Sequence, residues 1–389
     1  MSTRETSHGA PGWYDPAVHP ELRTSPPWVM DDMIDLQPAA VAETITAVDA
    51  AADEVADLLH GTIDAGEPIV VTGTGTAGHA ARGVAVALND ALGDPTNTRA
   101  EYRASEDQAR APRGGGLCIA VSHGGRSAST VGALTAARAN GALTALITAA
   151  DGTASHVLAD TVLRLPVRDA SYCHTIGYST PIAAGLQIAA RYKGRPLAAE
   201  AITGYLTGLL HLRIDALEIG RAMAHIERFV SVGCLADEPA ARELALDVAE
   251  AAWIPSAVFG VEDFLHGHMV GHDEASGLAV LCTGGPRPRD AAATAERLLR
   301  AADRIGIKAT LIVTEALGSR VDAPANRLTL PATDLPDTVV RLLGGALALQ
   351  SLTMALVGAK GTNPDLLRRH EPGYREAVTL GGAKLPPTS

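Results

Sequence analysis

Cysteine and aromatic residues are scarce in this chain of 389 residues, and their scarcity excludes several classes of protein. The four cysteines are far apart and form no Cys-x-x-Cys pair, which argues against a disulfide framework or a zinc ribbon. This cysteine usage favours a reducing compartment, so we predict a cytoplasmic protein. Aromatic residues make up only 3%, too few to provide stacking platforms for single-stranded nucleic acid.

Positive charge is also limited, because 32 basic residues stand against 44 acidic ones and the formal net charge is −12. A non-specific nucleic-acid binder needs the opposite balance or a dense basic patch, and the sequence has neither. A long apolar stretch without a charge, residues 342–359, is interrupted by glycine, glutamine, serine and threonine. A membrane-spanning helix needs about 20 mostly apolar residues, so we expect a buried helix there and no membrane partner. The polar N-terminus predicts no secretory signal.

The order of apolar and small polar segments predicts the fold class. A hydrophobic fraction of 47% excludes disorder as a description of the whole chain, and the length suits two domains. Residues 1–40 are predicted to form a proline-rich N-terminal arm and the first helix. A pattern of short strand, small polar turn and helix then recurs, and it restarts near residue 228. We therefore predict an α/β fold with two duplicated domains, 41–215 and 216–389, each a parallel sheet flanked by helices.

Two turns of the first predicted domain are candidates for binding an anion. Residues 73–80 read GTGTAGHA and residues 122–130 read SHGGRSAST, so both offer hydroxyls and free backbone N–H groups where a helix begins. Neither turn is a dinucleotide fingerprint or a Walker A loop. Serine and threonine also begin helices simply as N-caps, which is the alternative for either turn alone. Two such turns at the carboxyl ends of consecutive strands favour an anionic ligand.

A stretch rich in carboxylates and histidines follows in the second half. Glu243, Asp247 and Glu250 are spaced i, i+4 and i+7, so one helix face carries all three carboxylates. His266 follows Glu250 by sixteen residues.

Three interpretations of this stretch remain open. The first is a solvated acidic helix face followed by a polar loop. The second is a metal site at the histidines 266, 268 and 272, although their spacing matches no familiar metal motif. The third is acid–base chemistry, in which a buried glutamate is tuned toward neutrality and a nearby histidine carries a proton.

Taken together, these motifs resemble the SIS (sugar isomerase) family. The resemblance covers residues 30 to about 368, and it is closest to the tandem-SIS isomerase half of glucosamine-6-phosphate synthase and its relatives. Those relatives include ketoamine-phosphate deglycases and amino-sugar-phosphate deaminase/isomerases. Residues 30–38, MDDMIDLQP, resemble the family's first helix, and residues 361–365, GTNPD, match its C-terminal turn G-x-[DN]-x-D. The resemblance implies two SIS domains with a flavodoxin-like three-layer architecture.

The resemblance implies a sugar-phosphate site at the two turns. The family's GTS turn is replaced by one with Ala77 at the last position, which removes a hydroxyl. In the second turn, which resembles SQSGxT, histidine and glycine replace the glutamine and the second serine. Arg126 is a compensating candidate, since a guanidinium grips an oxyanion with two hydrogen bonds. The substrate-binding residues implied are Gly75, Thr76, Ser122, His123, Gly124, Arg126, Ser127 and, from a segment resembling AST, Ser179.

The catalytic residues come from the same resemblance. Glu250 stands where the family has its isomerising base, and His266 stands where it has the ring-opening histidine. In the family that histidine belongs to the neighbouring subunit, which implies a homodimer with a shared active site. Glu376 aligns with the family's Schiff-base lysine, and Lys384 is a candidate to replace it. No metal or other cofactor is implied. Residue 2 is serine rather than the catalytic cysteine of a glutaminase, so no glutaminase domain is expected.

The sequence therefore predicts a phosphosugar isomerase, or a deglycase or deaminase acting on an aminated sugar phosphate. The alternative is a non-catalytic SIS protein that binds a sugar phosphate as a sensor or as the partner subunit of an enzyme. The hydroxyls lost from the phosphate loop favour the binder, and the Glu250/His266 pair favours the enzyme. Sensors of this kind commonly carry a helix-turn-helix domain, for which residues 1–40 are too short.

Overall fold

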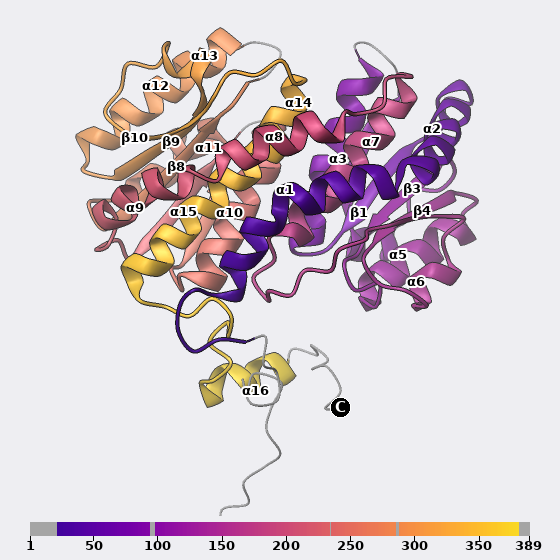
Figure 1. Cartoon of the computed structure of the whole chain (residues 1–389), viewed down its shortest axis with the longest axis horizontal. Coiled ribbons are helices and arrows are strands. Elements are labelled where there is room, and N and C mark those ends of the chain that lie inside the picture. The colour runs from indigo at the N-terminus through magenta and orange to yellow at the C-terminus, as the bar shows by residue number, and fades with distance from the viewer. Residues whose placement is uncertain (1–21, 94–97, 234, 285–287, 381–389) are drawn as a thin grey trace, which may run out of the picture.

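The computed structural model describes residues 22–93, 98–233, 235–284 and 288–380 (Figure 1). The strands form two five-stranded sheets, one in each half of the chain, and all of their pairings are parallel. Helices flank both sheets, because consecutive parallel strands need a crossover that returns the chain to the same edge. The prediction of an α/β fold with two parallel sheets is confirmed.

The first sheet has the strand order β2-β1-β3-β4-β5. Its central strands are buried along their whole length, because helices cover both faces of a parallel sheet. Helix α3 leaves the carboxyl end of β1, and α5 leaves that of β3. The strands are β1 (Ile69–Gly73), β2 (Ala100–Ala104), β3 (Leu117–Val121), β4 (Leu143–Thr148) and β5 (Thr161–Arg164). The helices are α1 (Val29–Ala47), α2 (Asp49–Asp64), α3 (Thr76–Leu92), α4 (Ser105–Arg110), α5 (Ala128–Ala139), α6 (Ala154–Val157) and α7 (Ile176–Tyr192).

The second sheet has the order β10-β9-β8-β6-β7. Numbered from its own first strand, this is the same order as in the first sheet, so the two halves share one topology. Two duplicated domains fit these two sheets. The strands are β6 (Arg228–Val232), β7 (Ser256–Phe259), β8 (Ser276–Cys282), β9 (Lys308–Thr314) and β10 (Asn326–Leu330). The helices from here to the end are α10 (Glu238–Ala251), α11 (Val261–His266), α12 (Pro288–Arg304), α13 (Glu315–Gly318), α14 (Asp337–Val339), α15 (Gly345–Lys360) and α16 (Pro372–Leu380).

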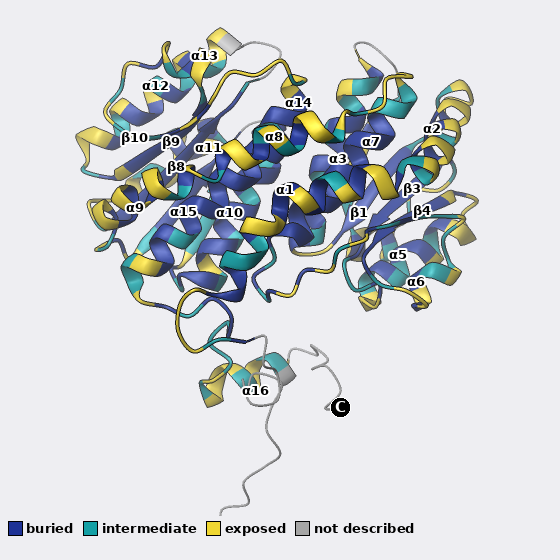
Figure 2. Ribbon diagram, in the orientation of Figure 1, coloured by how far each residue is buried: buried dark blue, intermediate teal, exposed yellow. Residues whose placement is uncertain are grey.

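One large apolar core runs through both halves of the molecule, where α3 and α7 of the first half meet α10 and α15 of the second. Figure 2 shows these central helices as largely buried, with exposed residues on the outer turns. Helix α10 contacts both α3 and α15. Through this contact the acidic face of α10 lies beside the carboxyl edge of the first sheet. The candidate site forms where the two meet.

The apolar segment near residue 350 belongs to this core. Within the described part of the chain, one helical stretch, Asp337–Lys360, is long and apolar enough to cross a membrane, with a mean hydropathy of 1.7. Of its most apolar window, 83% is buried inside the protein. We therefore interpret it as a core helix, as its sequence predicts.

Residues 176–222 form α7, α8 (Ala199–Leu209) and α9 (Leu212–Ala222), separated by short connections. The predicted domain boundaries fall inside α1 and α9, and they stay a prediction. Most of the N-terminal arm lies outside the described residues. The three described cysteines, Cys118, Cys173 and Cys282, are buried.

Candidate functional site

A pocket of about 420 Å³ lies at the carboxyl ends of β1 and β3. It is built from both halves of the chain, because α10 and the segment after α15 close the side opposite the two turns. The first half contributes hydroxyl groups and histidines to its lining, and the second half contributes a carboxylate and a guanidinium. The lining residues are Thr74, Gly75, Thr76, Ala77, Val121, Ser122, His123, Ser127, Thr130, Tyr172, His174, Gly177, Leu246, Glu250, Leu367 and Arg369.

The two predicted anion turns meet in this pocket. The Thr74 Oγ1 atom lies 3.1 Å from Ser129 Oγ, which in turn lies 2.8 Å from Ser127 Oγ. Gly75 has a φ of 60°, a left-handed conformation that glycine adopts without strain, and α3 begins at the next residue. The N-termini of α3 and α5 therefore both open toward the pocket, where their free N–H groups and positive dipole ends favour an anion.

The sequence-predicted binding residues divide into two groups. Five of them line the pocket: Gly75, Thr76, Ser122, His123 and Ser127.

The other three predicted binding residues are not among the lining residues. Gly124 lies in the turn between β3 and α5, and the Arg126 side chain is exposed in the same turn. Ser179 is fully buried inside α7, where its Oγ donates a hydrogen bond to the carbonyl of Thr175 at 3.5 Å. Their roles as ligands stay predictions.

Glu250 lines the pocket from the last turn of α10. Burial raises the pKa of its carboxyl group to about 7, and the neighbouring Glu243 adds to the rise, while His174 and Arg369 oppose it. A carboxyl group with this pKa exchanges a proton readily near neutral pH, which is the property that a general base requires.

The acidic face of α10 is buried, so the interpretation of a solvated face is wrong. Glu243 and Asp247 are fully buried. The Glu243 carboxylate lies 2.6 Å from His79 Nδ1 of α3, and Asp247 accepts a long hydrogen bond from the Cys173 thiol at 3.7 Å. Burial and the two neighbouring glutamates raise the pKa of Asp247 well above its usual value. The helix face therefore lines the boundary between the two halves instead of meeting water.

A histidine of the pocket and the buried aspartate beside it were not predicted from the sequence. His174 lines the pocket, and its Nδ1 lies 3.7 Å from the Oδ2 of the fully buried Asp169. Although burial opposes ionisation, the nearby His174 and hydrogen bonds from Ser171 and Gly177 hold the pKa of Asp169 at about 2. The segment between β5 and α7 carries both residues and has no motif of its own. An isolated Asp and an isolated His were therefore not enough to predict that these residues lie at the site.

An arginine of the C-terminal segment was also missed. Arg369 lines the pocket opposite the turns, and its guanidinium lies 5.9 Å from the ring of Tyr172. Burial lowers the pKa of Arg369, while the Glu250 carboxylate opposes this change. Its position four residues after the GTNPD turn was the available indication, because that turn places the chain beside the end of α10.

The remaining predicted catalytic residues lie elsewhere. His266 ends α11 outside the pocket, with 82% of its side chain exposed, and its Nε2 lies 3.3 Å from Glu262. Glu376 is exposed on α16, and Lys384 lies outside the described residues.

The other two histidines of the possible metal site have different contacts. His268 stacks on Phe259 with the ring centroids 3.9 Å apart, and His272 lies within 3.1 Å of the Ser276 hydroxyl. Among the residues that the structure describes, no group of three or more His, Cys, Asp and Glu is arranged to hold a metal ion.

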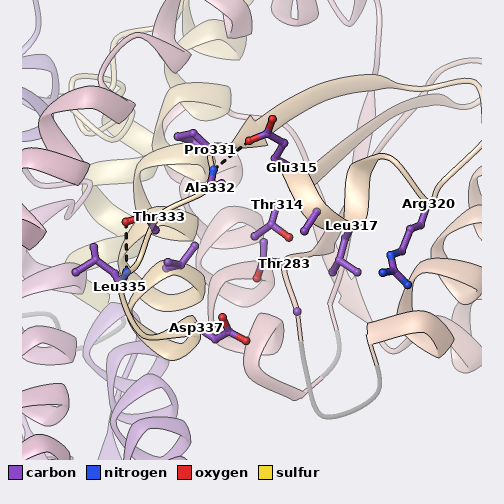
Figure 3. A pocket seen from close by; sticks show the side chains of 13 residues that line it. Thr283, Thr314, Glu315, Leu317, Arg320, Pro331, Ala332, Thr333, Leu335 and Asp337 are labelled. Carbon is purple, nitrogen blue, oxygen red and sulfur yellow. Dashed lines mark hydrogen bonds between the residues drawn. The ribbon is translucent and has the colours of Figure 1, made fainter.

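A second pocket of about 330 Å³ occupies the corresponding edge of the second sheet, at the carboxyl ends of β8, β9 and β10 (Figure 3). Its lining includes one guanidinium, that of Arg320, and two carboxylates, those of Glu315 and Asp337. The Glu315 carboxylate accepts a hydrogen bond from the backbone N–H of Ala332 at 3.2 Å. With two carboxylates and one cation, this pocket is less suited to an anion than the first.

The comparisons with known proteins agree with this arrangement. Residues 63–191 match the family model of the SIS domain, which spans β1 to α7 and includes both turns. The chain therefore contains a SIS domain, and the resemblance inferred from the motifs is confirmed. No curated protein matches the chain.

Solved structures with the same fold are similar over almost their full length. The C-terminal domain of glucosamine-fructose-6-phosphate aminotransferase from Francisella tularensis superposes with a TM-score of 0.74 at 18% identity, covering 87% of this chain and 98% of that one. Tagatose-6-phosphate ketose/aldose isomerase from Escherichia coli gives 0.72 at 18% identity, covering 88% and 95%. Glucosamine-6-phosphate deaminase from Thermotoga maritima gives 0.61 at 15% identity, covering 83% and 96%. At these identities the likeness establishes the fold.

Proposed function

We propose that this protein is an enzyme that isomerises a sugar phosphate, or deaminates or deglycates an aminated one, with Glu250 as the base. The observation that carries the proposal is the position of Glu250. Its carboxyl group lines the same pocket as the hydroxyl-bearing turns, although the two come from opposite halves of the chain. The solved structures with this fold include a ketose/aldose isomerase and a deaminase of phosphorylated sugars.

The phosphate group is proposed to bind at the two turns. Thr76, Ser122 and Ser127 supply hydroxyl groups, and the starts of α3 and α5 supply backbone N–H groups. Arg369 adds a cation on the other side of the pocket. This guanidinium offsets the hydroxyls that the turns have lost relative to the family.

The chemistry proposed is proton transfer through an enediol. Glu250 removes the proton from the carbon beside the carbonyl group and returns it to the neighbouring carbon, so the carboxylate is regenerated. A pKa of about 7 leaves a large share of Glu250 ionised at neutral pH and keeps it basic enough to accept the proton.

Two parts of the proposal depend on atoms beyond the described single chain. Ring opening by His266 requires a neighbouring subunit of a homodimer, because His266 lies outside the pocket of its own chain. Schiff-base chemistry by Lys384 would serve a substrate with a ketoamine or amine group. We propose a cytoplasmic location.

The test is the E250Q variant with fructose 6-phosphate or glucosamine 6-phosphate in deuterated water, followed by NMR. The wild-type protein should introduce deuterium at C1 or C2. E250Q should lose this exchange by about 10²–10⁴-fold, because the amide cannot accept the proton. Its affinity for the same sugar phosphate should stay within about threefold, since the phosphate contacts remain.

The matched control is E218Q, which makes the same change at an exposed site on α9. E218Q should exchange as the wild type does. Exchange by E250Q at the wild-type rate would contradict the role of Glu250.

The alternative function is a sugar-phosphate-binding protein without catalysis. Ala77 and Gly124 favour it, because both stand where a hydroxyl ligand of the family is missing. A wild-type protein that binds a sugar phosphate without any deuterium exchange would establish this alternative.

A further inference from the structure

Two histidines of the first half line the same pocket as Glu250. His123 follows β3, and His174 lies in the segment between β5 and α7; their ring centroids are 4.9 Å apart. Both line the pocket together with Glu250. Neither corresponds to the ring-opening histidine that the resemblance implies. His123 is a predicted binding residue, and His174 has no role yet assigned.

The segment around His174 is organised by Asp169. The Asp169 carboxylate accepts hydrogen bonds from the backbone N–H groups of Ser171, Thr175 and Gly177 at 2.7–2.9 Å, and from the Ser171 hydroxyl at 2.5 Å. These bonds fold the chain around the carboxylate and place the Nδ1 of His174 3.7 Å from it. A fully buried carboxylate needs a positive partner, and His174 supplies one when it is protonated.

The charges around His174 favour its protonated form. Burial lowers the pKa of His174, but the Asp169 carboxylate and then Glu250 and Glu243 raise it, and the net shift is upward. His123 behaves in the opposite way, because burial and the charge of His174 lower its pKa to about 4. The pair therefore consists of one imidazole with a raised pKa and one with a lowered pKa, and the position of Asp169 contributes to this difference.

We propose that His174, positioned by Asp169, is the proton carrier that acts on the oxygen atoms of the substrate opposite Glu250. The inference rests on the proposed function and deepens it by assigning this role within a single chain. Nδ1 faces Asp169, which leaves Nε2 on the opposite side of the ring to meet a ligand.

The proton steps balance over one isomerisation. Glu250 takes the proton from C2 of the aldose, and His174 gives its Nε2 proton to the carbonyl oxygen on C1, which produces the enediol. His174 then takes the proton of the hydroxyl on C2, and the protonated Glu250 gives its proton to C1. Both side chains return to their starting forms, and no other reactant is needed.

The first experiment compares exchange of fructose 6-phosphate in deuterated water by H174Q and the wild type. H174Q should lose about 10²–10⁴-fold in exchange rate, while its affinity for fructose 6-phosphate stays within about threefold. H225Q is the matched control, because His225 is exposed and outside the pocket. Exchange by H174Q within twofold of the wild type overturns the inference. Loss of exchange in H266Q but not in H174Q would assign the role to His266 of a neighbouring copy and also overturn it.

The second experiment follows the imidazole of His174 by NMR without any substrate. In the wild type His174 should titrate above the ordinary histidine value, and in D169N its pKa should fall. The basic limb of the exchange rate against pH should move down with it, a shift that loss of packing alone would not cause. Because D169N weakens the hydrogen bonds of its segment, E250Q provides a second variant with that segment intact, and there too the pKa of His174 should fall. A wild-type His174 that titrates at the ordinary value overturns the inference.

The outcomes separate the two proposals. Equal exchange by the wild type and H174Q contradicts only the role of His174. Binding of the sugar phosphate without exchange by the wild type contradicts the proposed enzyme, and the proton carrier that depends on it falls as well.

Discussion

At the scale of single residues, the site depends on how burial acts on three carboxylates of one helix. Glu243 has a cationic partner when His79 is protonated, Asp247 has only a thiol donor, and Glu250 faces the pocket. Taking a carboxylate out of water disfavours its charged form, so the pKa values of Asp247 and Glu250 rise. The proton affinity that suits Glu250 for catalysis is therefore a consequence of its place between the two halves.

This burial predicts a dependence of stability on pH. The folded protein holds Glu250 with a pKa of about 7 against 4.5 for the unfolded chain, so ionisation above pH 7 costs the folded state about 3 kcal/mol. The cost is absent below pH 4.5, where the group is neutral in both states, and grows as the pH rises through 7. We expect E250Q to be more stable than the wild type at pH 8 by up to about this amount, and nearly equal to it at pH 4.5, in urea unfolding monitored by circular dichroism.

The exposed control E218Q should show the same difference from the wild type at both pH values. A stability difference between E250Q and the wild type that does not change with pH would contradict the raised pKa of Glu250.

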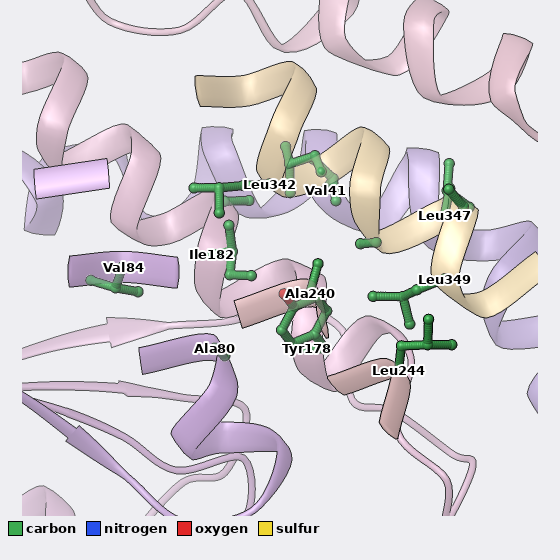
Figure 4. Packing of buried hydrophobic residues seen from close by; sticks show 14 of the residues in the cluster. Val41, Ala80, Val84, Tyr178, Ile182, Ala240, Leu244, Leu342, Leu347 and Leu349 are labelled. Atoms are coloured by element: carbon green, nitrogen blue, oxygen red, sulfur yellow. The ribbon is translucent and has the colours of Figure 1, made fainter. Parts of the chain in front are cut away.

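At the scale of elements, the position of the pocket depends on close packing of α3 against α7. Figure 4 shows Val84 of α3 and Ile182 of α7 beside Leu342 in the core. A Cβ atom added to Gly83 would lie 2.8 Å from Ile182, and one added to Gly185 would lie 2.7 Å from Val84. The two glycines thus let the helices approach, and this approach fixes the start of α3 against the segment that carries His174.

The G185A variant should destabilise the protein by about 1–3 kcal/mol, because the added methyl group overlaps Val84 and forces the helices apart. G204A on α8 is the matched control, since an added Cβ there meets nothing within 4 Å. G204A should instead stabilise the protein by up to about 1 kcal/mol, as alanine favours a helix more than glycine. Thermal unfolding of both variants checks the prediction, and equal effects would show that the helix approach does not limit packing.

At the scale of the whole molecule, contacts between the halves assemble the site. His79 belongs to the half that carries the two turns and Glu243 to the half that carries Glu250, and the pair lies in the boundary between them. At the other end of the chain, the Asp365 carboxylate accepts hydrogen bonds from the backbone N–H groups of Val29 and Met30. These two hydrogen bonds connect the start of α1 to the C-terminal segment and so help to place Arg369 beside the pocket.

The contact between His79 and Glu243 can be tested by replacing each residue alone and both together. H79Q should destabilise the protein by about 1–3 kcal/mol, because it removes the ring nitrogen that lies 2.6 Å from the fully buried carboxyl group of Glu243. The double variant H79Q/E243Q removes the carboxyl group as well and should recover most of that loss. Urea unfolding of the single and double variants measures this coupling. A double variant that is as unstable as the sum of the two single variants would contradict a direct interaction.

The sequence by itself determined the fold class and the two turns. Apolar periodicity, glycine and hydroxyl residues at the ends of strands are local features, and they specify strand, turn and helix before any long-range contact forms. The resemblance to the SIS family also singled out Glu250, which the structure places in the same pocket as the turns.

Only the tertiary structure decided which charges share that pocket. The roles of Asp169, His174 and Arg369 depend on contacts between segments far apart in the chain, and none of the three carries a motif. The spacing of the three carboxylates of α10 is the same for an exposed and for a buried helix face, so the sequence did not distinguish the two. Packing of α10 against α3 buried it, and burial in a low-dielectric environment is what changes the proton affinity of Glu250.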